Sequence, residues 1–272
     1  MRGRHRDHEL VIGALAHYED PAFYAQTHRR RIEDIAYYTH LARRAGTVLE
    51  YGIGSGRIAI SMAHAGASVV GVDHSRAMLR DLTRRLALEP TKVAKRVVAR
   101  FGDMRRLNLR RRFPLVVAPF NVLLHLYTRI DVERFLARVR HHLAPRGRFV
   151  MDISMPLPED LARDPMRAFH APRFKHPSAG VVQYREYFDY DRARQVLFVT
   201  AELTPVSAPG DTFAIPLAHR QFFPREWEAL LHYNGFTIEH MYGDFARTPL
   251  TSGSDTLVVH ARRRSAALRD SR

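Results

Sequence analysis

The sequence predicts an α/β protein with a doubly wound, mostly parallel, seven-stranded sheet, an N-terminal helical arm and an antiparallel β insertion as a cap. Three observations predict this class. Short apolar segments alternate with amphipathic helical segments from residue 47 to residue 153, the pattern of a parallel sheet covered on both faces. A glycine-rich turn follows the first apolar segment. After Ser154 the alternation stops, and strand-like segments follow one another directly.

The first part of the chain predicts one helix and then a regular alternation. Apolar residues at three- and four-residue spacing predict a helix over residues 17–45, which Gly46 ends. The predicted strands are residues 47–51, 68–72, 97–101, 115–119 and 148–153, and the predicted helices between them are residues 57–65, 76–88 and 132–143.

The second part changes in character. Residues 155–177 are rich in proline and charge and are expected to form a loop. Residues 180–200 predict two strands with a turn at 189–194, and residues 215–222 predict a third, so this segment is interpreted as an antiparallel cap. The last predicted elements are a helix over residues 225–234 and strands over 237–242 and 256–260.

Composition excludes several classes of function. The chain contains no cysteine, so disulfides, thiolate metal sites and cysteine nucleophiles are excluded, and a reducing, cytoplasmic location is expected. No run approaches the roughly 20 apolar residues of a membrane span. His170 and His176 lack a third ligand nearby in the sequence, so no metal site is expected.

The formal charge of +15 raises the question of a nucleic-acid partner. Of the 43 basic residues only Lys92, Lys95 and Lys175 are lysine, a skew that is typical of codon bias in a GC-rich genome. The densest internal run is five arginines between residues 105 and 112, which we interpret as a solvated loop. Nucleic acid is therefore not the expected partner.

The strand-to-helix turn of residues 48–56 carries the strongest chemical signal. It places Gly52, Gly54 and Gly56 at alternate positions, where the absence of a Cβ allows tight turning and the close approach of a ligand. The dinucleotide spacing needs a further glycine at position 57, which is Arg57, and no lysine follows for a phosphate-binding loop. The turn therefore predicts a nucleotide-type ligand other than a dinucleotide.

Two acidic residues follow the next two predicted strands. Asp73 ends the second strand, where a carboxylate can accept both hydroxyls of a ribose. Asp103 follows the third strand, where it can read the amino group of an adenine. The turn and the two acids together predict a ligand that contains adenosine.

These residues resemble the class I S-adenosylmethionine-dependent methyltransferases, a Rossmann-like family, over residues 46–153. The resemblance implies S-adenosyl-L-methionine as the cofactor and S-adenosyl-L-homocysteine as the product. The matching positions are Glu50, Gly52, Gly54 and Gly56 in the first motif, Asp73 with its neighbours His74 and Met78 at the ribose, and Asp103 with Met104 at the adenine.

A narrower resemblance lies in residues 119–126, 219–224 and 242–245, which are similar to the glycine/sarcosine and amino-sugar N-methyltransferase group. Members of this group methylate small molecules, and an N-terminal arm closes over the cofactor. The resemblance implies that Tyr24 and Arg31 face the methionine end of the cofactor, with Arg31 as the partner of its carboxylate.

The resemblance also implies an organisation of the chain. A helical arm or lid precedes a cofactor-binding core, the cap interrupts that core, the last strands complete it, and a basic tail follows. The boundaries expected for these five parts are residues 1–45, 46–154, 155–222, 223–262 and 263–272.

Methyl transfer from a sulfonium asks little of a protein beyond holding the nucleophile in line and excluding water. His125 is the candidate base for an acceptor that arrives protonated, although a histidine after an apolar run is also typical of a packed residue. Asn121, after the fourth strand, is a candidate contact to cofactor or substrate. The candidate substrate contacts in the cap, with strand packing as the alternative, are Tyr184, Arg185, Tyr187 and Arg220.

The leading hypothesis is methylation of a nitrogen, or else an oxygen, of a small molecule. An RNA or DNA methyltransferase is the alternative that the charge favours, but residues 118–121 lack the Asn/Asp-Pro-Pro-aromatic turn of enzymes that methylate exocyclic base amines. A third hypothesis is a cofactor-binding protein of the same fold without catalysis. The cap is a candidate homodimer surface, and the acceptor stays unassigned.

Overall fold

A computed structural model of the chain describes residues 2–264, with side chains from residue 7 onward. The chain divides into two compact units, residues 1–30 with 156–221 and residues 31–155 with 222–272. Most of the predicted basic tail, residues 265–272, lies outside the described residues. No described helix has the length and apolar character needed to cross a membrane.

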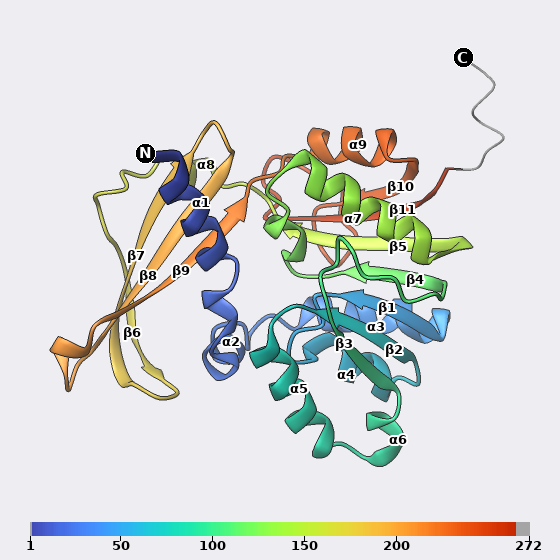
Figure 1. Ribbon diagram of the computed structural model, residues 1–272, viewed down its shortest axis with the longest axis horizontal. Coiled ribbons are helices and arrows are strands. Elements are labelled where there is room, and N and C mark those ends of the chain that lie inside the picture. Colours follow the sequence, from blue (N-terminus) through green and yellow to red (C-terminus); the bar gives the residue numbers. More distant parts are fainter. Residues whose placement is uncertain (1, 265–272) are drawn as a thin grey trace. The chain divides into compact units, whose positions relative to one another are not determined.

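The larger unit holds the predicted sheet of seven strands. The strands are β1 (Thr47–Tyr51), β2 (Ser68–Asp73), β3 (Val97–Phe101), β4 (Phe113–Ala118), β5 (Leu143–Ser154), β10 (Phe236–Tyr242) and β11 (Thr256–Arg263). Their order is β10-β11-β5-β4-β1-β2-β3 (Figure 1). Strands β1 to β5 pair in parallel, whereas β11 runs antiparallel to both of its neighbours. The predicted fold class is confirmed.

Helices cover both faces of this sheet because its strands are apolar on both sides. Along β1 the side chains alternate, so that Val48 packs in one core cluster and Leu49 and Tyr51 pack in the other. The first cluster includes residues of α3 (Glu33–Ala45), α4 (Arg57–His64), α5 (Arg76–Ala87) and α6 (Thr91–Ala94). The second includes residues of η2 (Val122–His125), α7 (Arg129–His142) and α9 (Pro224–Tyr233).

The smaller unit holds a four-stranded antiparallel sheet in the order β6-β7-β8-β9. Phe23 packs on this sheet in a small core with Val182 and Leu203. A Cβ on Gly13 would lie 2.8 Å from Ala218, so the first helix approaches β9 closely. The elements are α1 (Arg2–Gly13), η1 (Ala16–Tyr18), α2 (Pro21–Thr27), α8 (Pro158–Leu161), β6 (Phe169–His176), β7 (Gly180–Asp191), β8 (Val196–Pro205), η3 (Pro209–Asp211) and β9 (Phe213–Arg220).

The predicted continuous helix over residues 17–45 is wrong. Asp20 accepts hydrogen bonds from the N–H groups of Ala22 and Phe23 at 3.0 and 2.9 Å, so a short helix, α2, begins there as an N-cap requires. A separate helix, α3, begins at Glu33. The segment before residue 17, which was predicted only as part of the helical arm of residues 1–45, forms α1.

The predicted loop over residues 155–177 is also wrong in part, because β6 lies within it. Strand β6 is at the edge of its sheet, and its pairing with β7 shifts register between Ala171 and Phe174. Pro172 falls in this irregular stretch, where no ladder hydrogen bond needs its missing N–H group. A proline-rich segment can thus still supply an edge strand.

Candidate functional site

The glycine turn lies at the edge of the large sheet where the carboxyl ends of its five parallel strands meet. Gly52, Gly54 and Gly56 have φ angles of 72°, 54° and 83°. A Cβ on Gly52 would collide with Val122 and one on Gly56 with the end of the Leu82 side chain, so a larger residue at either position would require its neighbour to move. A Cβ on Gly54 would meet nothing within 4 Å. Gly54 is therefore the glycine whose backbone is open to a ligand.

Asp73, the predicted ribose acid, lies directly beside this turn. Its Oδ2 accepts the Gly54 N–H at 2.7 Å, and its Oδ1 accepts the Ser75 N–H at 2.8 Å. Burial raises the pKa of the Asp73 carboxyl, while the two N–H groups oppose that rise. Of its predicted companions, His74 is exposed and Met78 is fully buried on α5.

Glu50 lies on β1 immediately before the turn and is 2% exposed. Its Oε2 has no hydrogen-bond partner among the described residues. Burial raises the pKa of this carboxyl well above its ordinary value, although Arg57 opposes the rise. A buried carboxyl oxygen without a partner is unfavourable, so this atom marks a place where a ligand could supply a donor.

Asp103, the predicted adenine acid, is held by a neighbouring arginine. Arg105 donates from Nε at 3.0 Å and from Nη2 at 2.8 Å to Asp103, and from Nη1 at 2.6 Å to Asp131. Partial burial would raise the pKa of Asp103, but the hydrogen bonds from Arg105 lower it. Met104 packs against the core. The interpretation of Arg105 as part of a solvated loop is wrong, because it forms two ion pairs.

The turn after β4 is strained and tied to β5. Phe120 and Asn121 have φ angles of 51° and 63°, which non-glycine residues rarely adopt. Asn121 donates from Nδ2 to the Ser154 hydroxyl at 3.0 Å and accepts the Ser154 N–H at 2.6 Å. In η2, the Nδ1 of His125 lies 3.2 Å from the Tyr127 hydroxyl. Asn121 therefore fixes the ends of two central strands.

A buried acid near the end of β5, which the sequence analysis missed, organises the same edge. Asp152 is fully buried. Its Oδ1 accepts the Tyr38 hydroxyl at 2.7 Å and the Phe120 N–H at 3.0 Å, and its Oδ2 accepts from Arg31 at 2.8 Å. Burial raises the pKa of Asp152, while Arg31 and these hydrogen bonds oppose the rise. The signal in the sequence was a single acid within the apolar strand of residues 149–153.

Arg31 is the centre of this network. Its Nε donates to Asp34 at 2.8 Å, its Nη2 binds Asp152, and its guanidinium lies 4.3 Å from the centre of the Phe120 ring. Arg57 donates to both oxygens of Asp34, at 2.8 and 2.6 Å. Burial would raise the pKa of Asp34, but its bonds to Arg57 and Arg31 lower it. No described residue binds the Nη1 of Arg31, which leaves that donor for a ligand.

The remaining predicted site residues belong to the smaller unit. The Tyr24 ring packs with those of His17, Tyr18 and His28, at centroid distances of 4.6 to 5.6 Å. In the antiparallel sheet Tyr184 faces the small core, where it donates to Glu186 at 2.6 Å. The other predicted substrate residues lie on the opposite face of that sheet by strand register, namely Arg185, Tyr187 and Arg220.

The strand order, the glycine turn and the two strand-end acids together define an α/β domain of the methyltransferase class. Residues 48–147 match the family model described as a methyltransferase domain. This part of the chain is a methyltransferase domain, and the predicted class is confirmed. No curated protein matches the sequence.

Solved methyltransferase structures share the fold of nearly the whole chain. The CcbJ methyltransferase from Streptomyces caelestis is 23% identical, with 90% of this chain and 100% of that chain covered and a TM-score of 0.75. CalS10, an amino pentose methyltransferase from Micromonospora echinaspora solved with S-adenosylmethionine bound, is 20% identical, with 87% and 95% covered and a TM-score of 0.65. The glycopeptide N-methyltransferase MtfA, complexed with S-adenosylmethionine, is 22% identical, with 85% and 87% covered and a TM-score of 0.60.

Proposed function

We propose that this protein is an enzyme that transfers a methyl group from S-adenosyl-L-methionine to a nitrogen of a small molecule. The observation that carries the proposal is the open backbone of Gly54 between Glu50 and Asp73, within a methyltransferase domain. The acceptor class is supported by two structural neighbours, an amino pentose methyltransferase and a glycopeptide N-methyltransferase. An oxygen is the alternative acceptor atom.

Residues at the sheet edge fit the ribose and the methionine part of the cofactor. Asp73 would accept the ribose hydroxyls, and the backbone of Gly54 leaves room for the nucleoside beside it. The unpartnered Oε2 of Glu50 suits the amino group of the methionine part. The unused Nη1 of Arg31 suits its carboxylate, as a guanidinium donor next to a carboxylate should.

When bound, the cofactor would supply a methyl group on a sulfonium, which is electrophilic without further activation. The residues of this chain would then orient the acceptor, exclude water and remove one proton from its nitrogen. His125 lies on η2, directly after the turn that Asn121 fixes, and an imidazole is suited to accept a proton at neutral pH. We therefore assign it the role of base for an acceptor that arrives as an ammonium.

Cofactor binding can be tested by calorimetry with S-adenosylmethionine. In Asp73→Ala we expect at least about 30-fold weaker binding, because charge-assisted hydrogen bonds contribute about 1.5–3 kcal/mol each. Asp81→Ala is the matched control, since Asp81 is bonded to Arg84 and Arg85 on α5 and should change the affinity less than about twofold. Unchanged binding in Asp73→Ala would remove the basis of the site assignment.

The acceptor atom can be tested with matched pairs of substrates and methyl-labelled cofactor. Each pair would consist of an amino sugar and the same sugar with a hydroxyl in place of the amine. We expect label in the amine and none in the hydroxyl compound. Label that enters only the hydroxyl compounds would assign oxygen, and label that enters only RNA would contradict the small-molecule proposal.

A further inference from the structure

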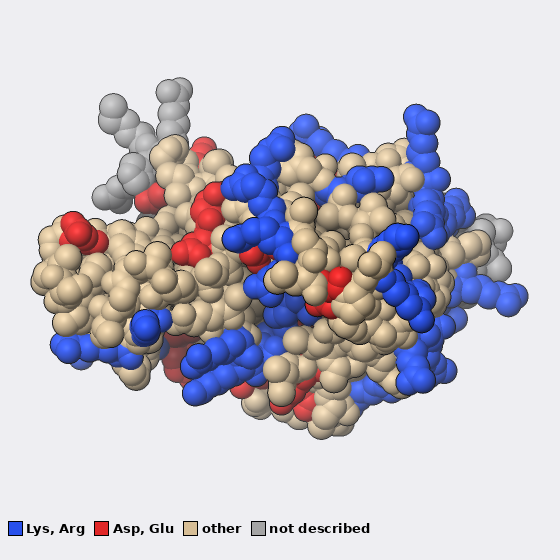
Figure 2. Space-filling view, turned by 90° about the horizontal axis from the view of Figure 1, so that it is seen from below, with Lys and Arg blue, Asp and Glu red and all other residues tan. Residues whose placement is uncertain are grey.

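The net positive charge of the chain is concentrated in one stretch. Residues 31–155 contain 23 basic and 10 acidic residues, whereas residues 156–264 contain 13 of each. Within residues 96–148, thirteen arginines stand against three acids, which accounts for +10 of the total charge of +15. Basic side chains clearly outnumber acidic ones on the face shown in Figure 2. The charge therefore belongs to particular elements and is not spread evenly.

The three acids of this stretch are already bound. Asp103 and Asp131 are both paired with Arg105, and Glu133 is paired with Arg129. Among the described residues, neither Arg106 nor the two arginines on the same side of α7, at positions 134 and 138, form an ion pair. Other arginines, such as Arg148 and Arg163, do have acidic partners.

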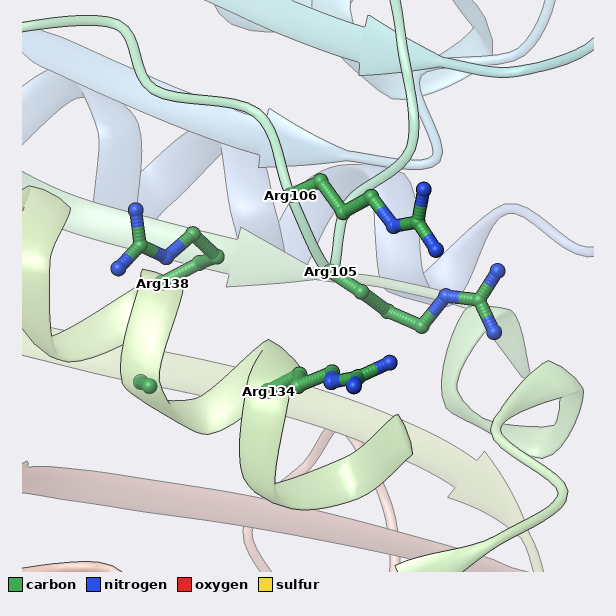
Figure 3. A pocket seen from close by; sticks show the side chains of 5 residues that line it. Arg105, Arg106, Arg134 and Arg138 are labelled. Carbon is green, nitrogen blue, oxygen red and sulfur yellow. The ribbon is translucent and has the colours of Figure 1, made fainter. Parts of the chain in front are cut away.

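These side chains surround one pocket of about 420 Å³, which we call the arginine pocket. Figure 3 shows Arg105 and Arg106 extending from the loop after β3, and Arg134 and Arg138 extending from α7. Ala137 completes the lining and leaves space between the longer side chains. Side chains of four arginines thus line a single hollow.

Two parts of the arginine pocket, the loop after β3 and the Arg105 side chain, are held by hydrogen bonds. The N–H of Leu109 donates to the buried His142 at 3.0 Å, which ties the loop to the end of α7. Arg105 is held by two carboxylates, so its guanidinium does not need to be ordered by a ligand. Preorganised donors bind an anion more tightly than mobile ones, because less conformational entropy is lost.

The arrangement is unfavourable without an anion. Arg134 and Arg138 are four residues apart on α7, a spacing at which like charges destabilise a helix. Guanidinium groups bind phosphate oxygens through paired N–H donors, and an anion with several oxygens can engage more than one of them. The pocket therefore has the charge and the hydrogen-bond donors to recognise phosphate groups.

We propose that the arginine pocket is a binding site for a compact phosphate-bearing anion, such as a diphosphate group. The site is separate from the proposed methyl-transfer function, since Arg134 and Arg138 contact none of the residues assigned to the cofactor. Two pocket residues do contact Asp103: Arg105 through its guanidinium, and Arg106 through its N–H, which donates to the Asp103 carbonyl at 3.0 Å. Variants at Arg134 and Arg138 therefore test the pocket and leave the predicted adenine acid in place.

The test is calorimetry of the full chain with inorganic phosphate, inorganic diphosphate and ADP, at about 0.15 M salt to screen weak surface attraction. We expect saturable binding of one diphosphate per chain, and at least about tenfold weaker binding in the double variant R134Q/R138Q. The control R43Q/R44Q removes the same charge from exposed positions on α3 and should change the affinity less than about twofold. Thermal unfolding of both double variants checks that they fold. If R134Q/R138Q does not fold, the single variants R134Q and R138Q are measured in its place.

The outcomes separate the sources of the phosphate group. Equal affinity for diphosphate and ADP would support recognition of the phosphates alone, and tighter binding of ADP would support a nucleotide as the ligand. Equal losses in R134Q/R138Q and R43Q/R44Q would overturn the proposal, because they would reflect net charge only. The absence of saturable binding, or binding of a 20-nucleotide RNA but of no small anion, would also overturn it.

Discussion

Gly52 and Gly54 share a left-handed backbone but have different surroundings. Alanine at either position adopts a strained φ that costs about 1 kcal/mol. In Gly54→Ala the methyl group meets no protein atom, so we expect a folded protein that has lost at least about tenfold in S-adenosylmethionine affinity. In Gly52→Ala the collision with Val122 should cost a further 1–3 kcal/mol of stability.

Denaturant unfolding and calorimetry would measure the two effects separately. Wild-type affinity in Gly54→Ala would mean that no ligand approaches this backbone. Equal stability of the two variants would mean that Val122 moves aside without cost.

Asp152 is the acid on which the sheet edge depends for its geometry. Asp152→Asn removes the charge opposite Arg31 while keeping the size of the side chain, and breaking a buried pair costs about 3–5 kcal/mol. We expect most of this decrease in the free energy of unfolding to be measured by chemical denaturation. Asp160→Asn is the control, because its pair with Arg163 is partly exposed and contributes less than about 1 kcal/mol. A similar stability in both variants would show that the Asp152 pair is not needed for the fold.

At the scale of residues, the sequence predicted the positions that follow a recognisable spacing. The glycines and Asp73 lie together as expected, because strand ends in a parallel sheet must meet. Asp152 was missed because its partners lie far away in the chain, as with Tyr38, which is 114 residues before Asp152. Such pairs depend on strand register and helix placement, which no local pattern specifies.

At the scale of elements, α7 begins with a capping box. Thr128 accepts the Asp131 N–H at 3.1 Å, and Asp131 accepts the Thr128 N–H at 3.2 Å. Thr128→Ala should cost about 1 kcal/mol of stability, because it leaves a helix-terminal N–H without its partner. Thr83→Ala is the control, since its hydroxyl bonds only a carbonyl of its own helix. Urea unfolding would distinguish them, and equal losses would contradict a capping role.

Helices and strands were predicted well where the spacing of apolar residues along the sequence was unambiguous, and poorly where it was not. The strand at residues 97–101 has the expected bounds, since apolar residues are flanked by clear breaks. Helix α1 contains arginines and histidines between few apolar residues, so no apolar stripe marks it. Strand β6 contains a proline and ends at His176, features that predict a loop unless the strand is known to lie at an edge.

At the scale of the whole molecule, a buried histidine links stability to pH. His142 accepts the Leu109 N–H with Nε2, so its Nδ1 carries the proton and donates to the Tyr51 hydroxyl at 2.8 Å. Burial lowers the pKa of His142 to about 4, below the ordinary value of 6.5. Between these values the unfolded chain binds a proton that the folded chain does not, so stability falls as pH decreases from 6.5 to 4.

We expect a loss of about 1–3 kcal/mol from His142 over that range. His17 and His260 add losses of the same sign, because burial lowers the pKa of each to about 4. In His142→Gln the free energy of unfolding, measured with denaturant between pH 7 and pH 4.5, should therefore depend less on pH than in the wild type. The dependence should not vanish, because His17 and His260 remain. An unchanged dependence would mean that folding does not shift the pKa of His142.

The total charge could be counted from the sequence, but the sequence did not show which arginines lie together in the fold. The five arginines of residues 105–112 predict a solvated loop when they are considered alone. In the structure the beginning of that run lies beside α7, which starts more than 20 residues later in the sequence. A charge count along the chain cannot show which arginines share a cavity, because that depends on the packing of separate elements.

The position of β11 has a consequence for the order in which the chain is made. This strand is the last described element, yet it lies between β5 and β10 in the sheet. While the ribosome is still synthesising residues 256–263, β5 has an open edge and β10 has no neighbour to pair with. The pairing of the large sheet can therefore be completed only after β11 has left the exit tunnel. A nascent chain stalled before residue 256 should remain a substrate for chaperones.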